Sequence, residues 1–131
     1  RDRNRADQQF KLMGKDFIML TGEDGNALEF NKRGGRGCIS VTANVATKLC
    51  SEMQDASLSR NDHNLQNKAE EINKILTPLN KSLFIESNPS PVKHAASLLG
   101  LSPEDVRLPL VKVTDGTKKI IKEALHQAKL I

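Results

Sequence analysis

Three side chains that can hydrogen-bond, Ser40, Thr42 and Asn44, alternate with apolar residues inside the segment 37–45. A serine hydroxyl becomes a nucleophile when an adjacent base removes its proton. Ser40 has no histidine or acidic residue near it in the sequence. We therefore predict strand packing and helix capping for these three residues, with Asn44 as the cap, rather than catalysis.

Gly22 stands in a second segment with possible chemistry. It follows the apolar run 17–20 and precedes Glu23 and Asp24. A glycine lets the backbone turn or approach a ligand closely, and acidic residues suit the positive N-terminal end of a following helix. The segment predicts a tight turn or a ligand-lining loop, followed by a helix.

The cysteines and histidines do not form a metal-binding pattern. Cys38 and Cys50 lie 12 positions apart without a CxxC motif, and His63, His94 and His126 are scattered. A zinc site needs about four converging ligands. We expect no metal, two reduced structural cysteines and hence a cytoplasmic protein. His94 and His126 are predicted to lie on helix surfaces.

The composition suits a soluble globular domain, with 37% hydrophobic and 27% charged residues among 131. The net charge is +4, but the basic residues are dispersed and only four Phe could stack on bases, so nucleic-acid binding is not expected. The local cluster of Arg1, Arg3 and Arg5 is interpreted as a solvated helix face. No apolar run approaches the ~20 residues that span a bilayer. Because the chain begins at Arg1 without Met, we expect a truncation point inside a longer protein.

A strand–helix–strand unit is predicted for the first half. The apolar runs 17–20 and 37–41 begin about 20 residues apart and have the length of strands buried on both faces. A helix over 25–32 would connect them, which makes the strands parallel. Further helices are predicted over 2–13 and 45–58.

The second half is predicted to be helical. Apolar residues recur at helical spacing over 62–82, and Pro78 predicts a kink or break there. Pro91 fits the first position of a short helix that Gly100 ends. A final helix runs from Thr114-Asp115 to about Ala128. Its residues predicted to face inward are Ile120, Ile121 and Leu125.

Two parallel strands cannot form a stable sheet alone, because they need neighbours and cover on both faces. The order of elements fits the last quarter of a (β/α)8 barrel, which typically takes ~250 residues. The predicted fold class is α/β: the C-terminal part of a TIM (β/α)8 barrel, with about two parallel strands, plus a C-terminal helical extension. Residues 1–58 would be the last βα units of the barrel, and 59–131 the C-terminal helical region.

The resemblance of this chain to a known family depends on four short segments and on their order along the chain. These segments are 20–24, 37–45, 86–93 and 107–110. Together they resemble the C-terminal part of the 4-hydroxy-tetrahydrodipicolinate synthase (dihydrodipicolinate synthase) family of pyruvate-dependent class I aldolases. The resemblance covers the chain from about residue 10 onward. Ser90 and His94 depart from it, since the family more often has an apolar residue and Trp at these positions.

The resemblance implies condensation of pyruvate with aspartate-4-semialdehyde, without a cofactor, in a protein that is commonly a homotetramer. A lysine would form a Schiff base with pyruvate, and the enamine would attack the aldehyde. That lysine and the assisting tyrosine are expected upstream of Arg1, so no catalytic residue is assigned in this chain, which alone should be inactive. Gly22 and Ile39 match positions whose backbone lines the pyruvate pocket at the C-terminal mouth of the barrel.

Two alternatives remain open. A sibling pyruvate-dependent lyase, such as N-acetylneuraminate lyase, would share the barrel and the Schiff base, although the segments 39–44 and 88–93 favour the synthase. A non-catalytic interaction module would instead use the +4 charge and exposed apolar edges. The module predicts a folded, monodisperse protein, whereas a barrel fragment predicts aggregation or a molten state.

Overall fold

The computed structural model describes residues 3–14 and 16–131. Two members of the predicted basic cluster, Arg1 and the side chain of Arg3, lie outside the described part, and the third, Arg5, is exposed on the first helix. The helices are α1 (Arg3–Met13), α2 (Ala27–Lys32), α3 (Thr47–Leu58), α4 (His63–Ser82), α5 (Ser90–Leu98) and α6 (Asp115–Gln127), with short 3₁₀ turns η1 (Asp24–Asn26) and η2 (Thr42–Asn44).

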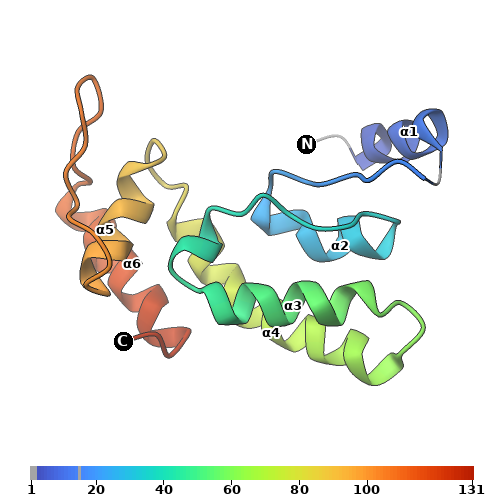
Figure 1. Ribbon diagram of the computed structural model, residues 1–131. Coiled ribbons are helices and arrows are strands. Elements are labelled where there is room, and N and C mark those ends of the chain that lie inside the picture. The colour runs from blue at the N-terminus through green and yellow to red at the C-terminus, as the bar shows by residue number, and fades with distance from the viewer. Residues whose placement is uncertain (1–2, 15) are drawn as a thin grey trace.

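The helices α3 and α4 form the centre of the molecule and lie side by side (Figure 1). The helix α2 packs on α3, while α5 and α6 pack together at the other end of α4. Gly14 and Gly100 follow α1 and α5 with φ of +78° and +70°, the left-handed conformation in which a glycine commonly ends a helix. Most predicted helices are thus confirmed within a few residues of their expected bounds.

The two predicted strands meet at a single parallel pairing, between Thr21 and Cys38. Backbone hydrogen bonds flank it: Arg36 N–H donates to the Met19 carbonyl at 2.9 Å, and Ile39 N–H to the Thr21 carbonyl at 2.8 Å. The parallel direction was predicted correctly. Regular strands were not, because no strand forms within residues 3–14 and 16–131.

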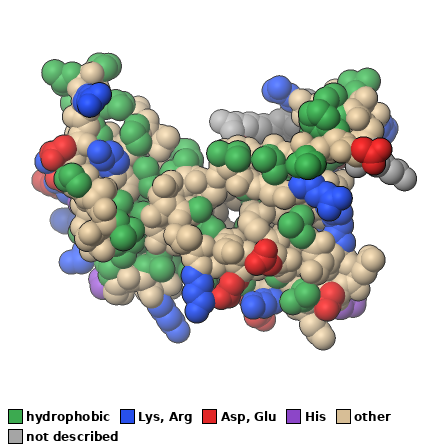
Figure 2. Space-filling view, in the orientation of Figure 1, with side chains coloured by type: hydrophobic (Ala, Val, Ile, Leu, Met, Phe, Trp, Pro, Cys, Tyr) green, Lys and Arg blue, Asp and Glu red, His purple; other side chains and the backbone are tan. Residues whose placement is uncertain are grey.

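The prediction that these runs are buried on both faces is also wrong. Phe17, Ile18 and Leu20 are exposed, and Ile39 is 70% exposed. Figure 2 shows hydrophobic side chains gathered along the upper edge of the molecule, over the extended segment that follows α1. The physical reason is that a strand pair with no neighbouring strand on either side has nothing to bury these side chains against.

One hydrophobic core joins α2, α3, α4, α5 and α6. Its most deeply buried large side chains are Leu76, Leu79, Leu83, Ile121 and Leu125. Fully burying each such side chain contributes about 1.5–3 kcal/mol. The core therefore lies between the helices of both halves of the chain, while most apolar side chains of the extended segment 17–20 remain exposed.

Three local expectations differ from the structure. Asn44 does not cap α3, because the N-cap of that helix is Ala46. The Asn44 side chain instead donates to the Val41 carbonyl at 2.9 Å. The helix α4 continues through Pro78 without a break. Ile120 is 47% exposed, whereas Ile121 is completely buried; consecutive helical residues lie 100° apart around the axis, and Ile120 falls outside the sector of α6 that faces the core.

Candidate functional site

The parallel pairing brings Gly22 and Ile39 to the same end of the two extended segments. Thr21 N–H donates to the Gly37 carbonyl at 3.0 Å, and the Thr21 carbonyl accepts from Ile39 N–H at 2.8 Å. Gly22 directly follows Thr21, so it lies beside Ile39. A Cβ built on Gly22 would meet nothing within 4 Å. The space over this backbone is open, and the Ile39 side chain projects into solvent.

Asp24 connects the two loops that follow this pairing. Its carboxylate accepts hydrogen bonds from the Ser40 hydroxyl, from Val41 N–H at 2.9 Å and from Thr42 N–H at 3.4 Å. Only 7% of Asp24 is exposed. Sequence reasoning missed this contact and left Ser40 without an acidic partner. The predicted parallel pairing indicated that the two following loops lie at the same edge, but it did not indicate which side chains of those loops would meet.

Ser40 and Thr42 fix the second loop from within. The Ser40 hydroxyl also accepts from Ala43 N–H at 2.8 Å, which makes it a local backbone cap. The buried hydroxyl of Thr42 donates to Asn80 Oδ1 at 2.7 Å and ties the loop to α4. These bonds use the two hydroxyls for structure.

A hollow of about 310 Å³ lies behind the loop, and Cys38 and Cys50 are among its lining residues. Burial, followed by the nearby Asp24 charge, raises the pKa of the Cys38 thiol to about 12. The same two causes raise the pKa of Cys50 to about 11. Both cysteines are free and protonated near neutral pH, so they are poor nucleophiles. Within residues 3–14 and 16–131, no group of three His, Cys, Asp or Glu residues could hold a metal ion.

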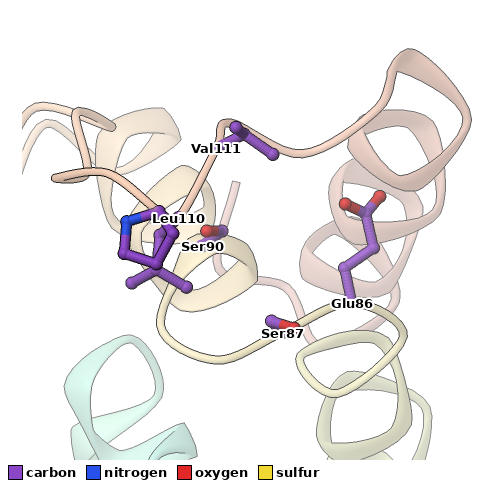
Figure 3. A pocket seen from close by; sticks show the side chains of 6 residues that line it. Glu86, Ser87, Ser90, Leu110 and Val111 are labelled. Carbon is purple, nitrogen blue, oxygen red and sulfur yellow. The ribbon is translucent and has the colours of Figure 1, made fainter.

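A second hollow, also of about 310 Å³, lies between the proline-rich corner and the extended segment before α6 (Figure 3). Glu86 lines it and accepts from Thr114 N–H at 3.0 Å and from the Thr114 hydroxyl at 2.8 Å. Hydrogen bonds from Thr117 and Thr114 hold the pKa of the Glu86 carboxyl below its ordinary value. Glu86 therefore holds the start of α6 in place.

His94 lies inside the fold, not on a helix surface as predicted. It is 8% exposed, and its Nδ1 lies 2.7 Å from a carboxylate oxygen of Glu104. Lys112 Nζ lies 3.2 Å from the other oxygen of Glu104. This cluster attaches the extended segment after α5 to that helix. The prediction for His126 is confirmed, since that residue is exposed on α6.

No helix in the described part of the chain combines the length and the apolar character that crossing a membrane would need.

Comparisons with known proteins give one consistent result. The 4-hydroxy-tetrahydrodipicolinate synthase of Pelagibacter ubique is 60% identical over 131 residues, which cover 99% of this chain and 44% of that relative. The dihydrodipicolinate synthase structure from Thermotoga maritima superposes with a TM-score of 0.90 at 34% identity, over 99% of this chain and 44% of that one. A structure described as the first monomeric dihydrodipicolinate synthase variant superposes with a TM-score of 0.85 at 35% identity. The match covers 95% of this chain and 40% of that one.

The chain thus spans less than half the length of the relatives it matches, and its neighbours are α/β barrel enzymes. The sequence profile of the dihydrodipicolinate synthetase family matches residues 1–128. This match covers nearly the whole chain, and the chain therefore belongs to the dihydrodipicolinate synthetase family.

Proposed function

We propose that this chain supplies the C-terminal portion of a 4-hydroxy-tetrahydrodipicolinate synthase, an enzyme that condenses pyruvate with aspartate-4-semialdehyde in lysine biosynthesis. The observation that carries the proposal is the 60% identity to a synthase over 99% of this chain. In this proposal, residues 1–58 are the last βα units of the barrel and residues 59–131 are the C-terminal helical region. The unburied apolar edge at Phe17, Ile18 and Ile39 supports it, because this edge is where further barrel strands would pack.

Gly22 and Ile39 are proposed to line the pyruvate pocket with their backbone. They end a parallel pairing, as residues at the mouth of a barrel do. The open space over Gly22 supports this role, since a small substrate could approach the main chain there.

The Schiff-base lysine and its assisting tyrosine are proposed to come from the remainder of the enzyme. A lysine that attacks a carbonyl must be neutral, which requires a lowered pKa. The pKa of Lys32 is instead raised, chiefly by its hydrogen bond with Glu70, and that of Lys112 is raised by Asp105 and Glu104. These two lysines are held in the charged form, opposite to what the reaction needs.

The test is a chimera in which residues 1–131 replace the matching 44% of the Pelagibacter ubique synthase. Incubation with pyruvate and sodium borohydride should reduce a Schiff base to a stable adduct, which intact mass and peptide mapping would detect. We expect one adduct on a lysine outside residues 1–131, and none on the 131-residue chain alone. A stoichiometric adduct on a lysine of the chain alone would refute the placement of the nucleophile.

The same chimera tests the substrate and the position of the chain. Turnover with aspartate-4-semialdehyde is expected, whereas turnover with N-acetylneuraminate and not with the semialdehyde would make the protein a sibling lyase. A control chimera with the chain at the amino-terminal end of the relative should form no adduct. An adduct in the control and none in the first chimera would reverse the proposed position.

The assembly is proposed to be a cytoplasmic homotetramer, by resemblance to the family. Sedimentation of the chimera would measure this directly. One structural relative is described as a monomeric variant, so a monomeric result would contradict the tetramer without contradicting the reaction.

A further inference from the structure

We infer that Asp24 is a positioning residue that sets the geometry of the pyruvate pocket. The two chain segments 21–24 and 39–42 are joined by hydrogen bonds at both ends, and together they form a closed ring that contains Gly22 and Ile39. The Asp24 carboxylate makes the hydrogen bonds that close this ring. This inference rests on the proposed function, because it assigns a purpose to the same site. Asp24 itself does not contact the substrate in this scheme.

The first link of the ring is the pairing at Thr21. The Thr21 carbonyl accepts from Ile39 N–H at 2.8 Å, and its N–H donates to the Gly37 carbonyl at 3.0 Å. These two bonds fix the end of one extended segment against the other. Gly22 is the next residue after this pairing on the first segment, and Ile39 is the next residue after it on the second.

The second link is the Asp24 carboxylate. It accepts from the Ser40 hydroxyl, from Val41 N–H at 2.9 Å and from Thr42 N–H at 3.4 Å. Two residues, Gly22 and Glu23, separate Thr21 from Asp24, and Ile39 immediately precedes Ser40. Gly22 and Ile39 therefore both lie in short segments between the Thr21 pairing and the Asp24 carboxylate. These two sets of hydrogen bonds together fix the direction of the backbone at both residues.

The ring is itself anchored in the fold. Thr42 Oγ1 donates to Asn80 Oδ1 at 2.7 Å, which ties the loop to α4, and Thr21 Oγ1 donates to Asn26 Oδ1 at 2.9 Å, which ties the other side to η1. Asp24 is buried, so competition from water at its carboxylate is limited. Charge-assisted hydrogen bonds of this kind are roughly twice as strong as neutral ones.

Without the carboxylate, the loop at 40–42 would lose its hydrogen bonds to Asp24, and the nearest backbone hydrogen bonds between the two segments would be those at Thr21. Small displacements of groups that position a substrate can cost orders of magnitude in rate or binding. Because Gly22 and Ile39 are proposed to contact pyruvate and not the aldehyde, the loss should fall mainly on the KM for pyruvate.

The experiment uses Asp24→Ala, Asp24→Asn and Ser40→Ala in the chimera described above. Asp24→Ala removes every bond of the second link and should raise the KM for pyruvate about tenfold or more, with a smaller change in kcat. Asp24→Asn retains one oxygen that can accept from Val41 and Thr42, and Ser40→Ala retains the carboxylate. Each should raise the KM only about two- to fivefold, so the conservative variant restores most of the binding.

Asp62→Ala is the matched control. The Asp62 carboxylate also accepts from two backbone N–H groups, those of Asn64 at 2.9 Å and Leu65 at 3.1 Å, but it does so at the start of α4. Asn80, which contacts the ring, lies near the other end of that helix, roughly 25 Å away at 1.5 Å per residue. The control should lower the melting temperature and leave the KM for pyruvate unchanged.

The outcomes separate the inference from the proposed function. A parent chimera that forms no adduct with pyruvate would overturn the proposed function and this inference with it. If the parent chimera is active and neither Asp24→Asn nor Ser40→Ala changes its KM for pyruvate, the inference alone is overturned, even if Asp24→Ala is too unstable to purify. An equal rise in KM in Asp62→Ala would also overturn it, because general loosening would then explain the effect.

Discussion

The hydrogen bonds of Asp24 are the most consequential single-residue feature of this chain. A buried carboxylate is costly unless it is well hydrogen-bonded. Here a hydroxyl and two main-chain N–H groups surround it. Because all three donors come from one loop, the bonds that stabilise the charge also fix the position of that loop.

The two thiols are expected to react slowly in the folded protein. Their pKa values of about 12 for Cys38 and about 11 for Cys50 leave little thiolate at pH 8. Alkylation of both in the native chimera should be roughly 10- to 100-fold slower than after denaturation, even though a thiolate of high pKa is more nucleophilic. Timed iodoacetamide labelling with peptide mapping measures this. Equal labelling rates before and after denaturation would show that burial does not protect them.

Glu104 makes stability depend on pH. Hydrogen bonds from His94 and Lys112 hold its pKa below the ordinary value of 4.5. A lowered folded pKa contributes stability that is present above the unfolded pKa and is lost as pH falls through the folded pKa. Glu104→Gln in the chimera should therefore lower the urea midpoint at pH 7 and should no longer do so well below pH 4. A constant difference between the two proteins across this range would contradict the assignment.

At the scale of elements, two adjacent isoleucines of α6 differ in burial because they lie at different angles around the helix axis. Ile121 is completely buried and Ile120 is 47% exposed. In the chimera, Ile121→Ala should lower the free energy of unfolding by about 2–5 kcal/mol, whereas Ile120→Ala should cost less than about 1 kcal/mol. Urea unfolding followed by circular dichroism measures both. Similar losses in the two variants would mean that another surface covers Ile120.

At the scale of the whole molecule, the side chains between the helices are buried, whereas large apolar side chains of the two extended segments are exposed to solvent. Exposed apolar patches and unpaired strand edges promote association. The 131-residue chain alone should therefore elute as aggregates and bind the dye ANS, while the chimera should not. Ile18→Lys, at a position that is 70% exposed, should reduce aggregation of the chain without changing its helix content. A monodisperse chain that binds no dye would instead favour the interaction module.

The sequence by itself determined the helices, the parallel direction of the two extended segments and the family. These properties depend on local signals, such as apolar spacing along α4, the glycines after α1 and α5, and short motifs in a fixed order. The roles of Gly22 and Ile39 stay predictions that such motifs support. Local signals were sufficient here because a helix is stabilised by groups three or four residues apart.

Tertiary structure alone decided which side chains are covered and which distant groups meet. It left Ile18 and Ile39 exposed, placed His94 against Glu104, and brought Asp24 to Ser40 across 16 positions of sequence. Burial depends on which neighbours are present, and a hydrogen bond between two loops depends on how the intervening chain folds. Neither quantity is encoded in the few residues around the group concerned, which is why the ring around the proposed pocket became visible only in three dimensions.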